Sequence, residues 1–167
     1  MWWLCCCLVF SIAGSTAARA EPDSEAPAFR FPLACDYGDT CFIQNFVDTR
    51  PGASYADHTC RHLSYNGHAG TDIRLPDLAA MRRGVDVVAA APGVVARVRD
   101  GMPDVSSDEI DPEEIAGREA GNGVVIEHGD GWVTQYSHLK QGSVAVAPGD
   151  EVAPGAKLGE VGLSGRT

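Results

Sequence analysis

The sequence predicts an all-β fold, a compact antiparallel sandwich or barrel. Short runs rich in valine recur at close spacing in its second half, and glycine or proline stands at nearly every joint between them. No stretch has the apolar spacing of a long amphipathic helix. At 167 residues, the chain has room for one such domain and a short appendage.

The expected strands are bounded by turn dipeptides such as Pro92-Gly93, Pro148-Gly149 and Pro154-Gly155. They cover residues 71–73, 85–90, 94–99, 124–128, 132–139, 143–146 and 158–161. Within 94–99, simple alternation places Val94, Ala96 and Val98 on one side and Val95, Arg97 and Arg99 on the other. The one expected helix has about two turns over residues 77–83, opened by Asp77 or Pro76 and closed by Gly84.

The N-terminus has the pattern of a secretory signal. Residues 2–13 are almost wholly apolar but too short to span a bilayer comfortably, and Ala18-Arg19-Ala20 offers a small-residue cleavage site. We expect residues 1–20 to be a signal peptide, with an uncleaved anchor as the alternative. The mature protein is therefore expected to be exported, to the periplasm or the cell exterior.

Residues 21–63 read as a linker followed by a turn-rich extension that contains cysteines, and residues 64–167 as the folded domain. Cleavage of the signal leaves three cysteines, Cys35, Cys41 and Cys60, in an oxidising compartment. A disulfide between Cys35 and Cys41 is the simplest pairing because Gly38 lets the chain fold back. Pairing of Cys41 with Cys60 stays open, since sequence cannot choose between them.

The charge balance argues against nucleic acid as a partner. The chain has 23 acidic and 13 basic residues, a formal net charge of −10, whereas phosphate binding needs a basic face. Six of the acids lie in residues 104–114. We expect a solvated loop there, because the segment lacks the acid spacing of a calcium-binding loop.

His68 and Asp72 are the first candidates for chemistry. Gly67 and Gly70 disfavour a helix at this point, and on a straight strand the two side chains would lie roughly 13 Å apart. A bend at Ala69-Gly70 would bring the imidazole and the carboxylate together, and zinc accepts both as ligands. By spacing alone, an ordinary loop histidine is favoured over a metal ligand.

His138 is the second candidate. It ends a strand on which Trp132, Thr134 and Tyr136 share its face by period two, and such a face can line a cleft. The alternative is a half-buried strand whose polar face meets solvent. Among the other histidines, we expect His128 to support its hairpin, while His58 and His62 have no recognisable partner.

The order of several short motifs carries more information than any one of them. Along residues 64–167 they are Gly67-His68-Ala69-Gly70-Thr71-Asp72-Ile73, Ala91-Pro92-Gly93-Val94-Val95, Gly121-Asn122-Gly123-Val124-Val125-Ile126, Tyr136-Ser137-His138-Leu139, Gly149-Asp150-Glu151-Val152 and Gly162-Leu163-Ser164-Gly165. This order resembles the lysostaphin-type (LytM-like) zinc metallopeptidases. The stretch from Cys35 to Cys41, continued by Phe42-Ile43-Gln44-Asn45, also resembles the leader of a periplasmic branch of that family.

The resemblance implies a duplicated-hybrid-motif-like β fold and a metalloendopeptidase that uses one Zn²⁺. His68 and Asp72 match the first two zinc ligands of the family. His138 matches the histidine that orients or deprotonates the catalytic water, or steadies the tetrahedral intermediate. The expected substrates are peptide bonds in the stems or cross-bridges of peptidoglycan.

The sequence departs from the family in two places. Family members continue to a His-x-His motif, which gives the third zinc ligand and a further catalytic histidine, and to a last strand; this chain ends at Thr167 without either. We expect a fragment of an active enzyme, with a non-catalytic wall-binding or regulatory module as the alternative. Ala120 and Ser137 also stand where relatives of this branch often have paired cysteines.

A rival from another class is a biotinyl or lipoyl carrier domain. The phrases Pro92-Gly93-Val94-Val95 and Gly149-Asp150-Glu151-Val152 resemble the two halves of that hammerhead, and Lys140 lies between them. Its neighbours Leu139 and Gln141 lack the usual flanking signature, and an export signal does not suit a cytoplasmic carrier. We therefore favour the peptidase.

Overall fold

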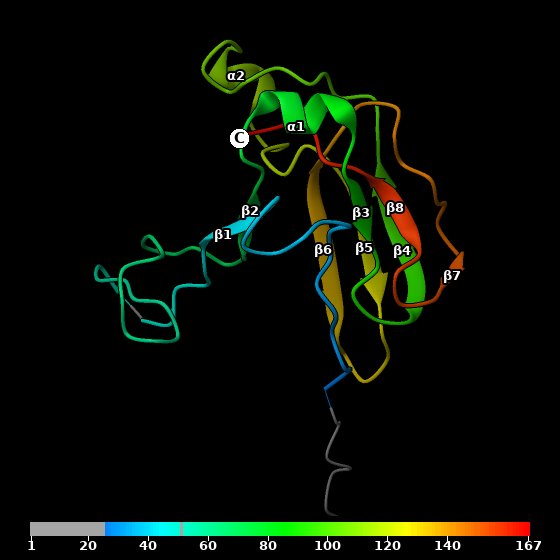
Figure 1. Cartoon of the computed structure of the whole chain (residues 1–167), viewed down its shortest axis with the longest axis horizontal. Helices are drawn as coiled ribbons and strands as arrows, with labels where there is room; N and C mark the ends of the chain where they lie inside the picture. Colours follow the sequence, from blue (N-terminus) through cyan, green and yellow to red (C-terminus); the bar gives the residue numbers. More distant parts are fainter. Residues whose placement is uncertain (1–25, 51) are drawn as a thin grey trace, which may run out of the picture.

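The computed structural model describes residues 26–50 and 52–167, and the expected signal peptide, residues 1–20, lies outside them. It confirms the all-β class, because the described residues form three antiparallel sheets and only two short helices (Figure 1). In the described part of the chain, no helix has the length and apolarity needed to cross a bilayer.

The largest sheet has four strands in the order β6-β5-β4-β7, and two smaller sheets pair β3 with β8 and β1 with β2. Their bounds are β1 (Phe42–Asn45), β2 (Asp72–Arg74), β3 (Asp86–Val88), β4 (Gly93–Arg99), β5 (Asn122–Glu127), β6 (Val133–Leu139), β7 (Glu151–Val152) and β8 (Lys157–Glu160). The expected hairpin is thus β5-β6. Residues 143–146 are not a strand, although the Ala145 amide donates a hydrogen bond to the Leu158 carbonyl at 2.9 Å.

The hydrophobic core lies where the β3-β8 pair meets the four-stranded sheet. Every strand of these two sheets contributes, and Ile126, Leu139 and Leu158 are completely buried. The remaining buried members are Val87, Ala89, Ala90, Val95, Val124, Tyr136 and Val152. Burial of this apolar area is the main force that holds the two sheets together.

A β-bulge overturns the alternation expected in β4. The register with β5 shifts between Val95 and Arg97, so that Val95 is 1% exposed while Val94 is 43% exposed. The bulge adds one residue at Ala96 and reverses the phase of the side chains after it. Val95 and Val98 therefore both pack against the core, whereas alternation had separated them.

The expected helix is confirmed as α1 (Leu78–Arg83). The Asp77 carboxylate accepts the amide hydrogen bond of Ala80 at 2.7 Å, and Gly84 ends the helix with φ 86°. A second helix, α2 (Pro112–Ile115), lies within the acidic segment expected to be a loop. Asp104 in that segment is also structural, because its carboxylate accepts amide hydrogen bonds from Gln141 and Leu163.

β1 belongs to the cysteine-containing extension, where no strand was expected. It pairs with β2, the strand that begins at Asp72, with Asn45 opposite Asp72 and Phe42 opposite Arg74. Figure 1 shows this two-stranded ribbon standing beside β6. The extension and the first strand of the expected domain therefore form one structural unit.

Candidate active-site groove

A groove of about 730 Å³ lies between the β1-β2 ribbon and β6. Asp72 lines it from β2 and His138 lines it from β6, so the structure brings these two candidates to the same hollow. α1 contributes Leu78 and Met81 to the wall, and residues 161–163 and 166–167 close another side.

His68 and Asp72 are in direct contact. The Nε2 atom of His68 lies 3.1 Å from Oδ1 of Asp72, and the bend that allows this is at Gly70. The turn before it uses Gly67 with φ 75°, a backbone conformation that suits glycine. His68 is 8% exposed, whereas the side chain of Asp72 is 45% exposed and reaches the groove.

The hydrogen bond on the other side of the imidazole assigns its tautomer. His68 Nδ1 lies 2.8 Å from the carbonyl oxygen of Phe46, which can only accept, so Nδ1 carries the proton. In the neutral ring, Nε2 then carries a lone pair, and this lone pair faces the carboxylate oxygen Oδ1 of Asp72. Two acceptors at this distance require a proton or a cation between them. This is the donor set of a metal site, one nitrogen and one oxygen.

The extension holds both side chains in position. Asn45 donates from Nδ2 to Oδ2 of Asp72 at 3.0 Å, and this leaves Oδ1 to face the imidazole. Phe46 supplies the carbonyl that orients His68, and the same oxygen accepts the hydroxyl of Ser64 at 2.9 Å. Neither residue was predicted from the sequence, in which residues 35–45 resembled only a family-like leader. A main-chain acceptor leaves no trace in side-chain patterns.

Asp48 ties the extension to the His68 turn a second time. Its amide donates to the His68 carbonyl at 2.8 Å, and its carboxylate accepts the amide of Gly67 at 3.0 Å. Hydrogen bonds from the backbone amides of Arg50 and Gly67 lower the pKa of Asp48, so the carboxylate stays charged at neutral pH. The turn that carries His68 is thus bonded to the extension through several main-chain groups.

Tyr65 is a further groove residue that the sequence did not reveal. Its ring stacks on the His68 imidazole with centroids 4.3 Å apart and planes at 29°. Burial raises the pKa of its hydroxyl, and the negative charge of Asp72 adds to the effect. Tyr65 therefore covers one face of His68 and presents a neutral hydroxyl close to Asp72.

His138 is oriented by a backbone carbonyl as well. Its Nδ1 lies 2.8 Å from the Ser164 oxygen, so Nδ1 donates and Nε2 is the lone-pair nitrogen. His138 has φ 60°, and the register with β5 shifts over this end of β6. Trp132 and Thr134, expected to share its face, do not line the groove. The strand's period of two is broken at the bulge.

The other histidines lie outside the groove. Both ring nitrogens of His128 are engaged, by the Pro92 carbonyl at 2.7 Å and the Thr134 hydroxyl at 2.8 Å, which fits the hairpin-supporting role expected for it. His58 packs edge-on against Phe46, and His62 packs against Tyr55. Among the described residues, no group of three His, Cys, Asp or Glu side chains could hold a metal ion.

The cysteines and a second hollow lie apart from this chemistry. Cys35 is bridged to Cys41, and Cys60 is a free, exposed thiol.

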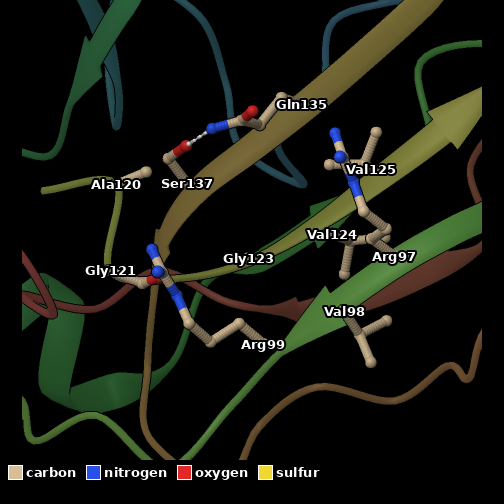
Figure 2. A pocket seen from close by; sticks show the side chains of 10 residues that line it. All are labelled: Arg97, Val98, Arg99, Ala120, Gly121, Gly123, Val124, Val125, Gln135 and Ser137. Atoms are coloured by element: carbon tan, nitrogen blue, oxygen red, sulfur yellow. Dashed lines mark hydrogen bonds between the residues drawn. The ribbon is translucent and has the colours of Figure 1, made fainter. Parts of the chain in front are cut away.

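A hollow of about 260 Å³ on β4, β5 and β6 brings Ala120 near Ser137, the two positions where relatives often have cysteines (Figure 2). Ser137 accepts a hydrogen bond from Gln135 there, and the Arg99 side chain donates to the Gly121 carbonyl.

Comparison with known proteins agrees with the motifs. Residues 66–167 match the model of peptidase family M23. The cell division protein DipM of Caulobacter vibrioides (strain NA1000 / CB15N) is 31% identical over 96 residues, which are 58% of this chain. The match covers 12% of the length of DipM.

Proposed function

Because this chain belongs to peptidase family M23, we propose that it carries the His-Asp part of the active site of a zinc-dependent endopeptidase. Its substrates are peptide bonds of peptidoglycan, which it meets after export to the periplasm or the cell exterior. The observation that supports this most is the contact of His68 Nε2 with Asp72 Oδ1 at 3.1 Å, beside a groove that His138 also lines.

His68 and Asp72 would hold the zinc ion. When bound, such an ion acidifies its water and polarises the scissile carbonyl, so that an amide can be attacked near neutral pH. A catalytic zinc usually has three protein ligands. The resemblance places the third ligand of this family in a His-x-His motif, which residues 1–167 do not contain.

The remaining groove residues position these groups and handle a proton. His138 keeps its Nδ1 proton on the Ser164 carbonyl, so Nε2 is free to accept a proton from the attacking water. Asn45 holds Asp72 by one oxygen, and Tyr65 packs over His68. The chain's own residues thus supply two ligands, one base and their supports.

A second candidate is a non-catalytic module that binds the cell wall or regulates another enzyme. The observation that favours it is the lack of any three-ligand group among the described residues. Such a module would sediment with insoluble peptidoglycan without cleaving it.

The decisive experiment uses the product of the intact gene. We expect it to bind one zinc ion per chain, by elemental analysis, and to release soluble peptides from purified peptidoglycan. His68→Ala and Asp72→Asn should lose both metal and activity. His138→Ala should keep the metal and lose about 10²-fold or more in rate, as expected for a missing general base.

His128→Ala is the matched control, because both nitrogens of His128 are bonded outside the groove. It should keep zinc and activity. A wild-type protein that binds peptidoglycan without cutting it would favour the module instead. We also expect the 167-residue chain alone to bind zinc weakly and to leave peptidoglycan uncut; stoichiometric zinc with full activity in that chain would contradict the missing-ligand argument.

A further inference from the structure

We infer that Arg74 binds a carboxylate of the substrate, so that the groove selects anionic stem peptides of peptidoglycan over neutral glycine cross-bridges. The inference rests on the proposed function and names the substrate class of the same groove. It is carried by the position of Arg74, by the absence of a protein partner for its charge, and by the other charges around it.

Arg74 stands two residues after the proposed ligand Asp72 on β2, and both line the groove. Alternate residues of a strand share a face and lie roughly 7 Å apart. An extended peptide has the same spacing between its own alternate residues. A substrate whose scissile carbonyl lies near Asp72 would therefore place a group one or two residues away beside the guanidinium of Arg74.

The guanidinium is held in place without being neutralised. Its Cζ atom lies 5.0 Å from the ring centroid of Phe42, the residue opposite Arg74 in the β1-β2 register. Arg74 is exposed, and its side chain takes part in none of the ion pairs formed by the described residues. Stacking on an aromatic ring restricts the side chain while leaving the planar fork of N–H donors free for a ligand.

The other charges of the groove do not compete for that fork. Its two aspartates are already engaged, Asp72 by His68 and Asn45, and Asp77 by the Ala80 amide at the start of α1. The other cation that lines the groove is Arg166. The pKa of Glu119 is lowered mainly by hydrogen bonds from the backbone amides of Glu119 and Gly117, and the nearby positive charge of Arg166 lowers it further. Arg74 is therefore a groove cation that has no carboxylate partner among the described residues.

The charge of the whole chain makes this position informative. With a net charge of −10, most of the surface repels an anion, whereas the exposed guanidinium of Arg74 attracts one to the groove. Arginine pairs with carboxylates through two parallel hydrogen bonds, which a lysine cannot reproduce. A free carboxylate occurs on peptidoglycan stem peptides but not within a chain of glycines.

Binding to the 167-residue chain tests the inference without requiring catalysis. The probes are a synthetic stem tripeptide with free carboxylates, the same tripeptide with its carboxylates amidated, and pentaglycine amide, measured by isothermal titration. We expect the acidic tripeptide to bind about tenfold more tightly than either neutral probe, as one charge-assisted pair provides. Arg74→Gln should remove this preference, and Arg74→Lys should restore only part of it.

Arg97→Gln is the matched control, because Arg97 is an exposed arginine that lines the hollow of Figure 2 and not the groove. It should keep the full preference. Equal affinity for all three probes, or an equal loss in Arg97→Gln and Arg74→Gln, would overturn the inference in favour of unspecific electrostatics.

The intact gene product separates this inference from the proposed function. If it cleaves acidic and amidated cross-links at equal rates, the role of Arg74 is overturned while the peptidase stands. If it cleaves neither, but the binding preference and its loss in Arg74→Gln are observed, the peptidase fails and the carboxylate site stands.

Discussion

The β-core and the segment from Asn45 to Leu63 are held together by different forces. Ile126, Leu139 and Leu158 are completely buried in the core, where apolar surface provides the stability. Among the described residues of the segment, the buried side chains are those of Ala56 and Asp57, and carboxylates organise the backbone. The segment rather than the core touches His68 and Asp72. Stability of the fold and geometry of the site are therefore separable properties.

Asp57 illustrates how the segment is built. Its carboxylate accepts hydrogen bonds from the amides of Thr59, Arg61 and Leu63 and from the Thr59 hydroxyl. Carboxylate and amides satisfy one another without apolar packing. Such a loop can open without unfolding the sheets, and the following predictions test that separation.

The largest expected effect is global. Leu158→Ala leaves a cavity among the buried residues of the core and should lower the free energy of unfolding by about 2–5 kcal/mol. Denaturant titration measures the loss. Leu78→Ala is the control, since Leu78 is 50% exposed on α1, and its loss should be much smaller. Equal losses would mean that burial in the core is not what makes the Leu158 side chain stabilising.

A smaller effect is expected at the site alone. Asn45→Ala removes the hydrogen bond to Asp72 Oδ2 and should weaken zinc binding by the intact protein about 10- to 100-fold, as for other supports of metal ligands. Competition with a chelator measures the affinity. Gln44→Ala changes the neighbouring groove residue and should have little effect. If, without zinc, Asn45→Ala has a lower melting temperature than the wild-type protein, the core and the site are coupled.

A local effect is expected for Asp57→Asn. The amide keeps the shape but loses acceptor capacity, so hydrogen exchange at Thr59, Arg61 and Leu63 should accelerate by roughly tenfold or more, while Val124 and Ile126 keep their protection. Asp108→Asn, at an exposed acid, is the control. Faster exchange in β5 would argue that the segment supports the core.

The smallest effect is expected on acidification below pH 4. Hydrogen bonding by the Thr59 hydroxyl, ahead of the backbone amides, lowers the pKa of Asp57 from 3.8 to about 2. A lowered carboxyl pKa stabilises the fold above pH 3.8, and that contribution is lost as the pH falls towards 2. The protection of amides in residues 57–63, relative to the intrinsic exchange rate at each pH, should therefore decrease across this window before the core opens. If amide protection is lost in residues 57–63 and in the β-core at the same pH, the two regions do not open separately.

Much of the fold and part of the site could be predicted from the sequence. Hairpin β5-β6 follows from two β-branched runs around Gly129-Asp130-Gly131, and α1 from Asp77 and Gly84 as its caps. The bulges at Ala96 and beside His138 could not be predicted. Each depends on how one strand fits against its neighbour, and the residues themselves carry no special signature.

The sequence by itself predicted the family, most strands of the core and a glycine hinge that could bring His68 to Asp72. These depend on residue types and on interactions within a few positions of the chain. Only the tertiary structure decided that Asn45 and the Phe46 carbonyl hold this pair, and that Arg74 lies beside it in the groove. The contacts of Asn45 and Phe46 join residues more than twenty positions apart, and they require a strand pairing that local preferences do not specify.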